Sequence, residues 1–319
     1  MVVLNLLFFI IACAILVVSG RWLVKSLIKI AQFLKITEYV AAFIIMAIAT
    51  SIPELFVGIS SALSKNTALV LGNVIGANII DITLIIGIFT LIGKGIKVET
   101  KGTKNDVFYM ILIVMLPIVL FLIGGSISRI DGIILVAIFC IYSYRLIKRS
   151  RKFEKVYKGE RKIKRHEIIL NVLLFIASLV ILFGSASFII KYATALSSEL
   201  ALPPIMIGLF LISIGTTLPE LTFGMRAVLA RHKEMAISNQ IGTIIVNSTL
   251  VLGISAIIYP ISAAFYLFAM SAAFLLLACF IFATFIKSGR KIDVTEGISL
   301  ILLYIFFVIL EFYIKGAMN

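Results

Sequence analysis

Two short motifs place a carboxylate, a hydroxyl and a proline together inside apolar stretches of the chain. Residues 49–55 read Ala-Thr-Ser-Ile-Pro-Glu-Leu, and residues 215–221 read Gly-Thr-Thr-Leu-Pro-Glu-Leu. Each motif puts a threonine four residues before a glutamate, so on a helix the two side chains are predicted to face the same way. Carboxylates and hydroxyls are hard oxygen ligands, suited to Ca²⁺ or Na⁺ rather than to a metal that prefers sulfur.

The proline before each glutamate predicts a break in the helix. Proline has no N–H and crowds the carbonyl four residues earlier, which here belongs to Ala49 or Gly215. That carbonyl is then available to another partner. In a bilayer, such broken backbone is tolerated only where it is buried in protein or lines a polar cavity. We therefore expect each motif to form half of a cation site.

The composition predicts an all-α polytopic membrane protein. Apolar residues make up 62% of the 319 residues and charged residues 14%, with a mean hydropathy of +1.18. Soluble domains carry about 25% charged residues. A chain of this length has room for about ten transmembrane helices of about 20 residues each. The first apolar run, residues 2–20, is expected to be a span rather than a signal peptide, since it lacks a basic leader and a cleavage site.

The net charge of +14 does not indicate nucleic acid, because the basic residues gather in connections between apolar runs. The lipid bilayer is the expected partner, and no obligate protein partner is evident. Residues 145–166 carry eleven positive charges against Glu154 and Glu160. This segment is predicted to be a cytoplasmic loop that fixes topology. The alternative is a regulatory segment on anionic lipid, where each basic residue adds about 1 kcal/mol.

An internal repeat divides the chain. An offset of 166 aligns residues 47–87 with 213–253 without a gap, and 14 of the 41 positions are identical. This similarity indicates a duplication. In the first copy, Gly72 and Gly76 form a small-residue pair four residues apart, which predicts a close approach between helices. We expect a first five-helix repeat over residues 1–144, the basic loop over 145–166 and a second five-helix repeat over 167–319. Because five is odd, the second repeat is expected to enter the membrane inverted.

The distribution of basic residues sets the expected orientation in the cell membrane. With the central loop inside, 25 of the 29 lysines and arginines lie in inside connections and four lie outside. Cytoplasmic connections are the ones enriched in Lys and Arg. We therefore predict that both termini are outside.

Three acidic residues, Glu54, Asp81 and Glu220, lie well inside predicted spans, and no basic residue lies at matching depth. A charge at the bilayer centre costs at least about 2.5–3.5 kcal/mol, so mobile cations are expected to neutralise them. The alternative is that they are protonated acids that hold helices together. Glu311, near the end of the last span, is expected to be interfacial. Inverted repeats whose broken helices meet at the midplane are a design of secondary transporters.

The chain resembles the cation/calcium exchanger superfamily, and most closely its prokaryotic sodium/calcium exchangers. The first repeat carries Ala-Thr-Ser-Ile-Pro-Glu at 49–54 and Gly-Asn-Val-Ile-Gly-Ala-Asn-Ile-Ile-Asp at 72–81. The second carries Gly-Thr-Thr-Leu-Pro-Glu at 215–220 and Ser-Asn-Gln-Ile-Gly-Thr-Ile-Ile-Val-Asn at 238–247. The resemblance implies antiport of Ca²⁺ against Na⁺ by alternating access, with no cofactor.

The resemblance also implies a set of ion ligands. Calcium would be held by two glutamates and two threonines: Glu54, Glu220, Thr50 and Thr216. Sodium would use the glutamates together with flanking oxygens, from Ala47, Ser51, Ser213, Thr217 and Thr243.

Four positions depart from the family pattern and leave the coupling ion open. Ala49 stands where a glycine is usual, and Ala77 where a serine hydroxyl helps to bind sodium. Asp81 occupies a position that is often Asn, and Asn247 one that is Asp in some relatives. The alternatives are a K⁺-dependent exchanger and a Ca²⁺/H⁺ antiporter whose glutamates carry the protons.

Two other classes of function, an intramembrane enzyme and a channel, fit the sequence less well. An intramembrane enzyme using a carboxylate pair is a distant alternative, because no nucleophile, histidine base or Cys/His metal set lies at membrane depth. A channel is less consistent with duplicated broken helices. In a carrier with three carboxylates, one divalent ion or several monovalent ions balance the charge, whereas both sets together leave excess buried positive charge.

Overall fold

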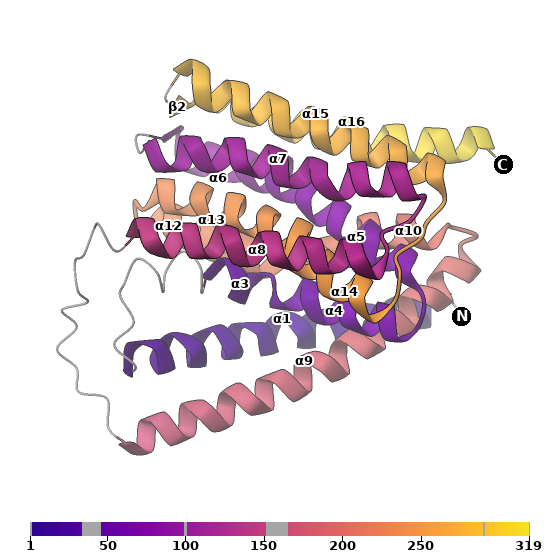
Figure 1. Ribbon diagram of the computed structural model, residues 1–319, viewed down its shortest axis with the longest axis horizontal. Coiled ribbons are helices and arrows are strands. Elements are labelled where there is room, and N and C mark those ends of the chain that lie inside the picture. Colours follow the sequence, from indigo (N-terminus) through magenta and orange to yellow (C-terminus); the bar gives the residue numbers. More distant parts are fainter. Residues whose placement is uncertain (1, 34–45, 99–100, 151–164, 290, 319) are drawn as a thin grey trace.

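The chain folds into a bundle of long helices (Figure 1). The computed structural model describes residues 2–33, 46–98, 101–150, 165–289 and 291–318. Within these residues, seven helices are long and apolar enough to cross a membrane, and one bent pair brings the number to eight. The protein is therefore a helical, multi-pass membrane protein. Both chain ends lie at one end of the molecule, and the start of α9 lies at the other (Figure 1).

The elements of the first half are α1 (Val2–Phe33), α3 (Met46–Thr50), α4 (Ile52–Leu63), α5 (Thr67–Ile80), the π-helical turn η2 (Asp81–Ile85), α6 (Ile86–Ile92), β1 (Ile96–Lys97), α7 (Lys101–Gly124) and α8 (Arg129–Ser150). The span Thr67–Ile92 runs through α5, η2 and α6. The predicted second span begins among residues 34–45, which lie outside the described residues.

The second half contains α9 (Arg165–Glu199), α10 (Pro204–Ile207), the π-helical turn η4 (Gly208–Ile212), α11 (Ser213–Thr216), α12 (Leu218–Leu229), α13 (Lys233–Val246), the π-helical turn η5 (Asn247–Val251), α14 (Leu252–Ile258), α15 (Phe265–Gly289), β2 (Lys291–Ile292) and α16 (Val294–Met318). The span Lys233–Ile258 runs through α13, η5 and α14.

The first helices of the two halves pack along each other. α1 and α9 lie side by side at one edge of the bundle (Figure 1). Leu16 and Leu182 are fully buried in the hydrophobic cluster that these helices form with α4 and the start of the broken span in the second half. The outer face of α9 exposes Leu173 and Val180, as expected of a helix that faces lipid.

Equivalent glycines bring each half against the last helix of the other half. A Cβ at Gly87 of α6 would lie 2.8 Å from the carbonyl oxygen of Gly297 of α16. A Cβ at Gly253 of α14 would lie 2.9 Å from the carbonyl oxygen of Gly132 of α8. Gly253 is the counterpart of Gly87 under the offset of 166. The two halves therefore use one glycine position for the same close helix–helix contact.

The short β contacts repeat in the same way. Strands β1 and β2 pair antiparallel through Ile96 and Ile292, and an isolated antiparallel bridge joins Ile127 to Ile261. The offset of 166 places the counterparts of the first pair at positions 262 and 126, within one residue of the second. Each bridge joins the connection after one half's third span to the hairpin between the other half's last two helices.

Candidate functional site

Both predicted helix breaks are present. α3 ends at Thr50 and α4 begins at Ile52, so Ser51 interrupts the first broken span, with φ −80° and ψ 3°. Thr217 interrupts the second, with φ −81° and ψ −2°, and the segments on either side of it are bent by 42°.

The two prolines occupy the first turn of the helix after each break, where a missing N–H costs least. Pro53 and Pro219 are the second residues of α4 and α12. Neither proline can donate a hydrogen bond to the carbonyl four residues before it. Each break thus leaves a backbone oxygen, from Ala49 or Gly215, without its normal helical donor.

The three membrane-embedded carboxylates come together. Glu54, Asp81 and Glu220 each have 0% of their surface exposed. Asp81 lies close enough to Glu54 for their charges to repel, and Glu220 is close to both. No carboxylate oxygen of the three accepts a hydrogen bond of normal geometry from the residues that the structure describes. Such a cluster is unfavourable unless protons or cations balance its charge.

The carboxylates do not suffice as a ligand set on their own. In the described part of the chain, no three acidic, histidine or cysteine side chains are grouped so as to hold a metal ion. Calcium takes six to eight oxygen ligands, including carbonyls and hydroxyls. Neutral oxygens around the glutamates must therefore complete any cation site here.

The threonines approach the glutamate of the opposite motif. The side chain of Thr216 interacts with Glu54, and that of Thr50 interacts with Glu220. Each threonine therefore lies beside the glutamate of the other half. The spacing within one motif predicted only that its own threonine and glutamate face the same way, and that stays a prediction.

Each threonine also contacts the neighbouring span of the other half, in a different way. Thr50 and Thr243 place their hydroxyl oxygens 3.3 Å apart. Thr216 donates instead to Oδ1 of Asn73, at 3.1 Å. The counterpart of Thr243 is Ala77, which has no hydroxyl. Thr216 therefore bonds to a side chain one helical turn earlier.

The remaining predicted sodium ligands differ in how their oxygens are used. Ser51 is buried, and its hydroxyl has no hydrogen-bond partner among the described residues. The hydroxyl of Ser213 donates to the carbonyl of Leu209, and that of Thr217 donates to the carbonyl of Ile214 at 3.4 Å. These two hydroxyls retain lone pairs for a cation. Ala47 lies in α3, where only its carbonyl offers an oxygen.

Asp81 and Asn247 each begin a π-helical turn, η2 and η5. They are counterparts under the offset, so both halves widen the helix at the same place. A π turn inside an α-helix is rare and is frequently found at functional sites. Nothing in the apolar sequence around either residue predicts it.

Two further polar residues at the site were not predicted. Asn78 lies one turn before Asp81 and Ser248 directly follows Asn247, and both are almost fully buried. Their signal in the sequence is a polar residue within a span whose other positions are apolar. Asn78 donates to the hydroxyl of Ser248 and accepts from the amide of Asn247.

The predicted close approach at the small-residue pair Gly72 and Gly76 is confirmed. A Cβ at Gly72 would lie 2.1 Å from the carbonyl oxygen of Ile205, and one at Gly76 would lie 2.3 Å from that of Leu209. The span that carries Asp81 therefore packs backbone against backbone on the broken span that carries Glu220. Small residues are typical of such contacts in membranes.

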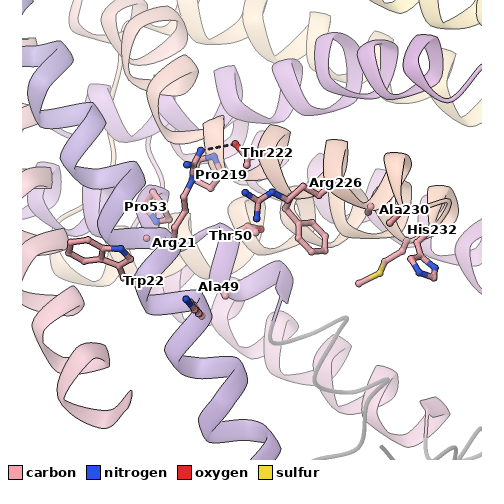
Figure 2. Close-up of a pocket in the computed structure, with 15 residues that line it drawn as sticks. Arg21, Trp22, Ala49, Thr50, Pro53, Pro219, Thr222, Arg226, Ala230 and His232 are labelled. Carbon is pink, nitrogen blue, oxygen red and sulfur yellow. Dashed lines mark hydrogen bonds between the residues drawn. The ribbon is translucent and has the colours of Figure 1, made fainter. Parts of the chain in front are cut away.

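A cavity of about 550 Å³ is lined in part by residues of both broken spans. It lies between α1 and α12, and Thr50, Pro53 and Pro219 form part of its wall (Figure 2). Figure 2 shows Arg21 of α1 reaching toward Thr222 of α12, to which it donates a hydrogen bond at 3.0 Å. The cavity therefore leads from the surface of the bundle to a threonine of the site.

One carboxylate outside the site is also buried. Glu311 is 2% exposed, and Ser271 of α15 lies 2.6 Å from its Oε1. The last span, Val294–Ile314, ends shortly after Glu311. Its interfacial depth stays a prediction, while its side chain packs against α15.

The family model described as "Sodium/calcium exchanger protein" matches residues 4–148 and 170–313. The chain belongs to this family. The two matched stretches are separated by most of the basic segment 145–166. Members of the sodium/calcium exchanger family are transporters, so this protein is a secondary transporter and not an enzyme.

Individual relatives match all or part of the chain. The sodium/calcium exchanger MaX1 of Methanosarcina acetivorans is 26% identical over 98% of this chain and 100% of its own length. A solved structure of the sodium-calcium exchanger NCX_Mj has a TM-score of 0.67 and 25% identity, covering 97% of this chain and 98% of that one. The human sodium/potassium/calcium exchanger 4 is 28% identical over 47% of this chain and 24% of its own.

Proposed function

We propose that this exchanger carries Ca²⁺ in one direction and Na⁺ in the other by alternating access. The observation that carries the proposal is the pair of glutamates, Glu54 and Glu220, buried beside two broken helices. Their carboxylate oxygens have no hydrogen-bond donors of normal geometry among the described residues. Two adjacent carboxylates surrounded by hydroxyls and unpaired carbonyls suit a desolvated hard cation.

Calcium is assigned to Glu54 and Glu220 together with Thr50 and Thr216. The cross-pairing of the threonines supports this set, because each carboxylate then has a hydroxyl from the other half beside it. The flanking oxygens are assigned to sodium and come from Ala47, Ser51, Ser213, Thr217 and Thr243. Asp81 adds a third carboxylate, and Asn247 adds a neutral oxygen.

The two kinds of ion occupy the site in turn. Three carboxylates in a medium of low dielectric constant balance one divalent ion or several monovalent ions. Both sets together would leave uncompensated positive charge in the protein interior, which is strongly unfavourable. Alternation between the two loads therefore follows from charge balance alone.

Ten spans in two inverted repeats complete the proposed architecture. α3–α4 and α8 supply the second and fifth spans, beside the eight that length and composition identify. The inversion is supported by the equivalent contacts of Gly87 and Gly253 with the opposite half. Residues 1–144 and 167–319 are the two repeats, with 145–166 as a cytoplasmic loop and both termini outside.

Proton or potassium coupling is the second candidate. Ala77 removes one hydroxyl from the proposed sodium shell, and three adjacent carboxylates can also carry protons. The similarity to a protein named as a sodium/potassium/calcium exchanger favours testing potassium as a co-transported ion.

The first test of this proposal is whether calcium movement needs a counter-ion. The purified protein is reconstituted into liposomes, and uptake of ⁴⁵Ca²⁺ is measured with and without an opposing cation gradient. An exchanger takes up calcium only when a counter-ion leaves. Calcium entry at the same rate without any counter-ion would indicate a channel or uniporter instead.

A further inference from the structure

A chain of buried hydrogen bonds holds the amide of Asn247 from one side. Asn247 Nδ2 donates to Oδ1 of Asn78 at 3.3 Å, and Asn78 Nδ2 donates to Oγ of Ser248 at 3.0 Å. The three side chains are 0%, 1% and 2% exposed, respectively. This bridge links the span that carries Asp81 to the turn that carries Asn247.

The bridge exists on one side of the duplicated site only. Under the offset of 166, the counterpart of Asn78 is Ile244 and that of Ser248 is Ile82. Both counterparts are apolar, so Asp81 has no equivalent bridge beside it. Asn78 and Ser248, which have no polar counterparts, therefore lie beside Asn247. Asn247 is the neutral member of the Asp81/Asn247 pair.

An asparagine amide must be held in one orientation to offer its oxygen to a cation, whereas a carboxylate need not be. The two ends of an asparagine side chain differ, because the oxygen can bind a cation and the NH₂ group cannot. Both oxygens of an aspartate are equivalent in this respect. With Nδ2 of Asn247 committed to Asn78, its Oδ1 points elsewhere and has no hydrogen-bond partner among the described residues. An unpartnered acceptor at 0% exposure is costly unless a ligand uses it.

We propose that Asn78 is a positioning residue that fixes the amide of Asn247 so that its Oδ1 serves as a ligand for the transported cation. Ser248 fixes Asn78 in turn by accepting from its Nδ2. Asn78 acts through Asn247 and does not itself contact the ion. This inference rests on the proposed exchange function, because it assigns Asn247 to the ion site.

The test compares Asn78→Ala and Ser248→Ala with the native protein in proteoliposomes. Loss of one neutral hydrogen bond is expected to raise the half-saturating calcium concentration about three- to tenfold for Asn78→Ala, with a smaller change in the maximal rate. Ser248→Ala is expected to raise the half-saturating calcium concentration less. Thr249→Val is the matched control, since Thr249 lies on the same turn and is equally buried, but donates only to the carbonyl of Ile245.

The decisive arm repeats Asn78→Ala in an Asn247→Asp background. A carboxylate presents an oxygen whichever way it rotates, so Asn78→Ala should then change the half-saturating calcium concentration less than twofold. An equal effect of Asn78→Ala in both backgrounds would overturn the proposal, because it would show a purely structural role. If Asn78→Ala does not fold, Ser248→Ala is compared in the same two backgrounds.

Equilibrium binding of ⁴⁵Ca²⁺ to the purified protein gives the same comparison if Asn247→Asp does not transport. The proposed function is tested separately by Glu54→Gln. If that variant transports calcium normally, the ion site is elsewhere. If it is inactive but the Asn78 effect persists in both backgrounds, only the positioning role fails.

Discussion

Thr216 donates a hydrogen bond to Asn73 across 3.1 Å, linking the second helix break to the third span of the first half. Its counterpart Thr50 instead lies 3.3 Å from the hydroxyl of Thr243. The difference follows from Ala77, which stands where the first half would need a hydroxyl to match Thr243. The ion site is therefore duplicated in its two glutamates but asymmetric in the hydroxyls beside its threonines.

Restoring the missing hydroxyl should strengthen sodium coupling. Ala77→Ser gives Thr216 a hydroxyl partner equivalent to Thr243 and adds an oxygen to the proposed sodium shell. We expect the half-saturating sodium concentration for calcium exchange to fall about two- to tenfold, the range of one added hydrogen-bonding group. The measurement is sodium-driven ⁴⁵Ca²⁺ flux. Thr243→Ala, which removes the hydroxyl from the other half, should raise the half-saturating sodium concentration. If neither variant changes this concentration, neither residue belongs to the sodium site.

Neutralising either site glutamate should stop transport. Glu54→Gln and Glu220→Gln each remove a charged ligand and leave a site whose charge no longer balances calcium, so we expect calcium flux to fall about a hundredfold or more. Glu199→Gln is the control, because Glu199 is exposed at the end of α9 and accepts a hydrogen bond from Asn5. Flux at the native rate in either site variant would place the calcium site elsewhere.

The backbone contact between the third span and the second broken span should be intolerant of any side chain. Gly76→Ala places a Cβ 2.3 Å from the carbonyl oxygen of Leu209, so the helices must separate. We expect a loss of about 1–3 kcal/mol in stability, measured as a lower thermal unfolding midpoint in detergent. Gly184→Ala should leave the midpoint unchanged, since no atom lies within 4 Å of its added Cβ. Equal midpoints for the two variants would contradict the contact.

The inverted topology predicts which loops face the outside. In a background without the native cysteines, single cysteines at Ser64 and Ser198 should react with a membrane-impermeant reagent in intact cells. Both positions are exposed at the ends of their helices. A cysteine at Ser150, within the basic segment 145–166, should react only after the membrane is opened. Labelling of that position from outside would overturn the orientation.

Sequence patterns predicted the parts of the site that depend on local backbone chemistry. The two prolines, Pro53 and Pro219, determine where the helices break, and proline acts in the same way in any tertiary setting. The small pair Gly72 and Gly76 likewise predicted a close helix contact. The repeat then placed equivalent carboxylates on both sides of the site.

The parts that depend on packing could not be predicted from spacing. Thr50 approaches Glu220 and Thr216 approaches Glu54, and the spacing within one motif carries no signal for these contacts between the two halves. The π turns at Asp81 and Asn247 arise in sequence that carries no local signal for them. The burial of Glu311 against Ser271 likewise depends on how α15 and α16 pack, which the sequence does not reveal.

The most direct test of sodium/calcium exchange compares two driving forces in the same proteoliposomes. Uptake of ⁴⁵Ca²⁺ is measured with an outward sodium gradient at fixed pH, and separately with a pH gradient in the absence of sodium, each with and without potassium. We expect uptake under the sodium gradient, abolished in Glu54→Gln, and little uptake under the pH gradient alone. Uptake driven only by the pH gradient would contradict sodium coupling and identify a calcium/proton antiporter.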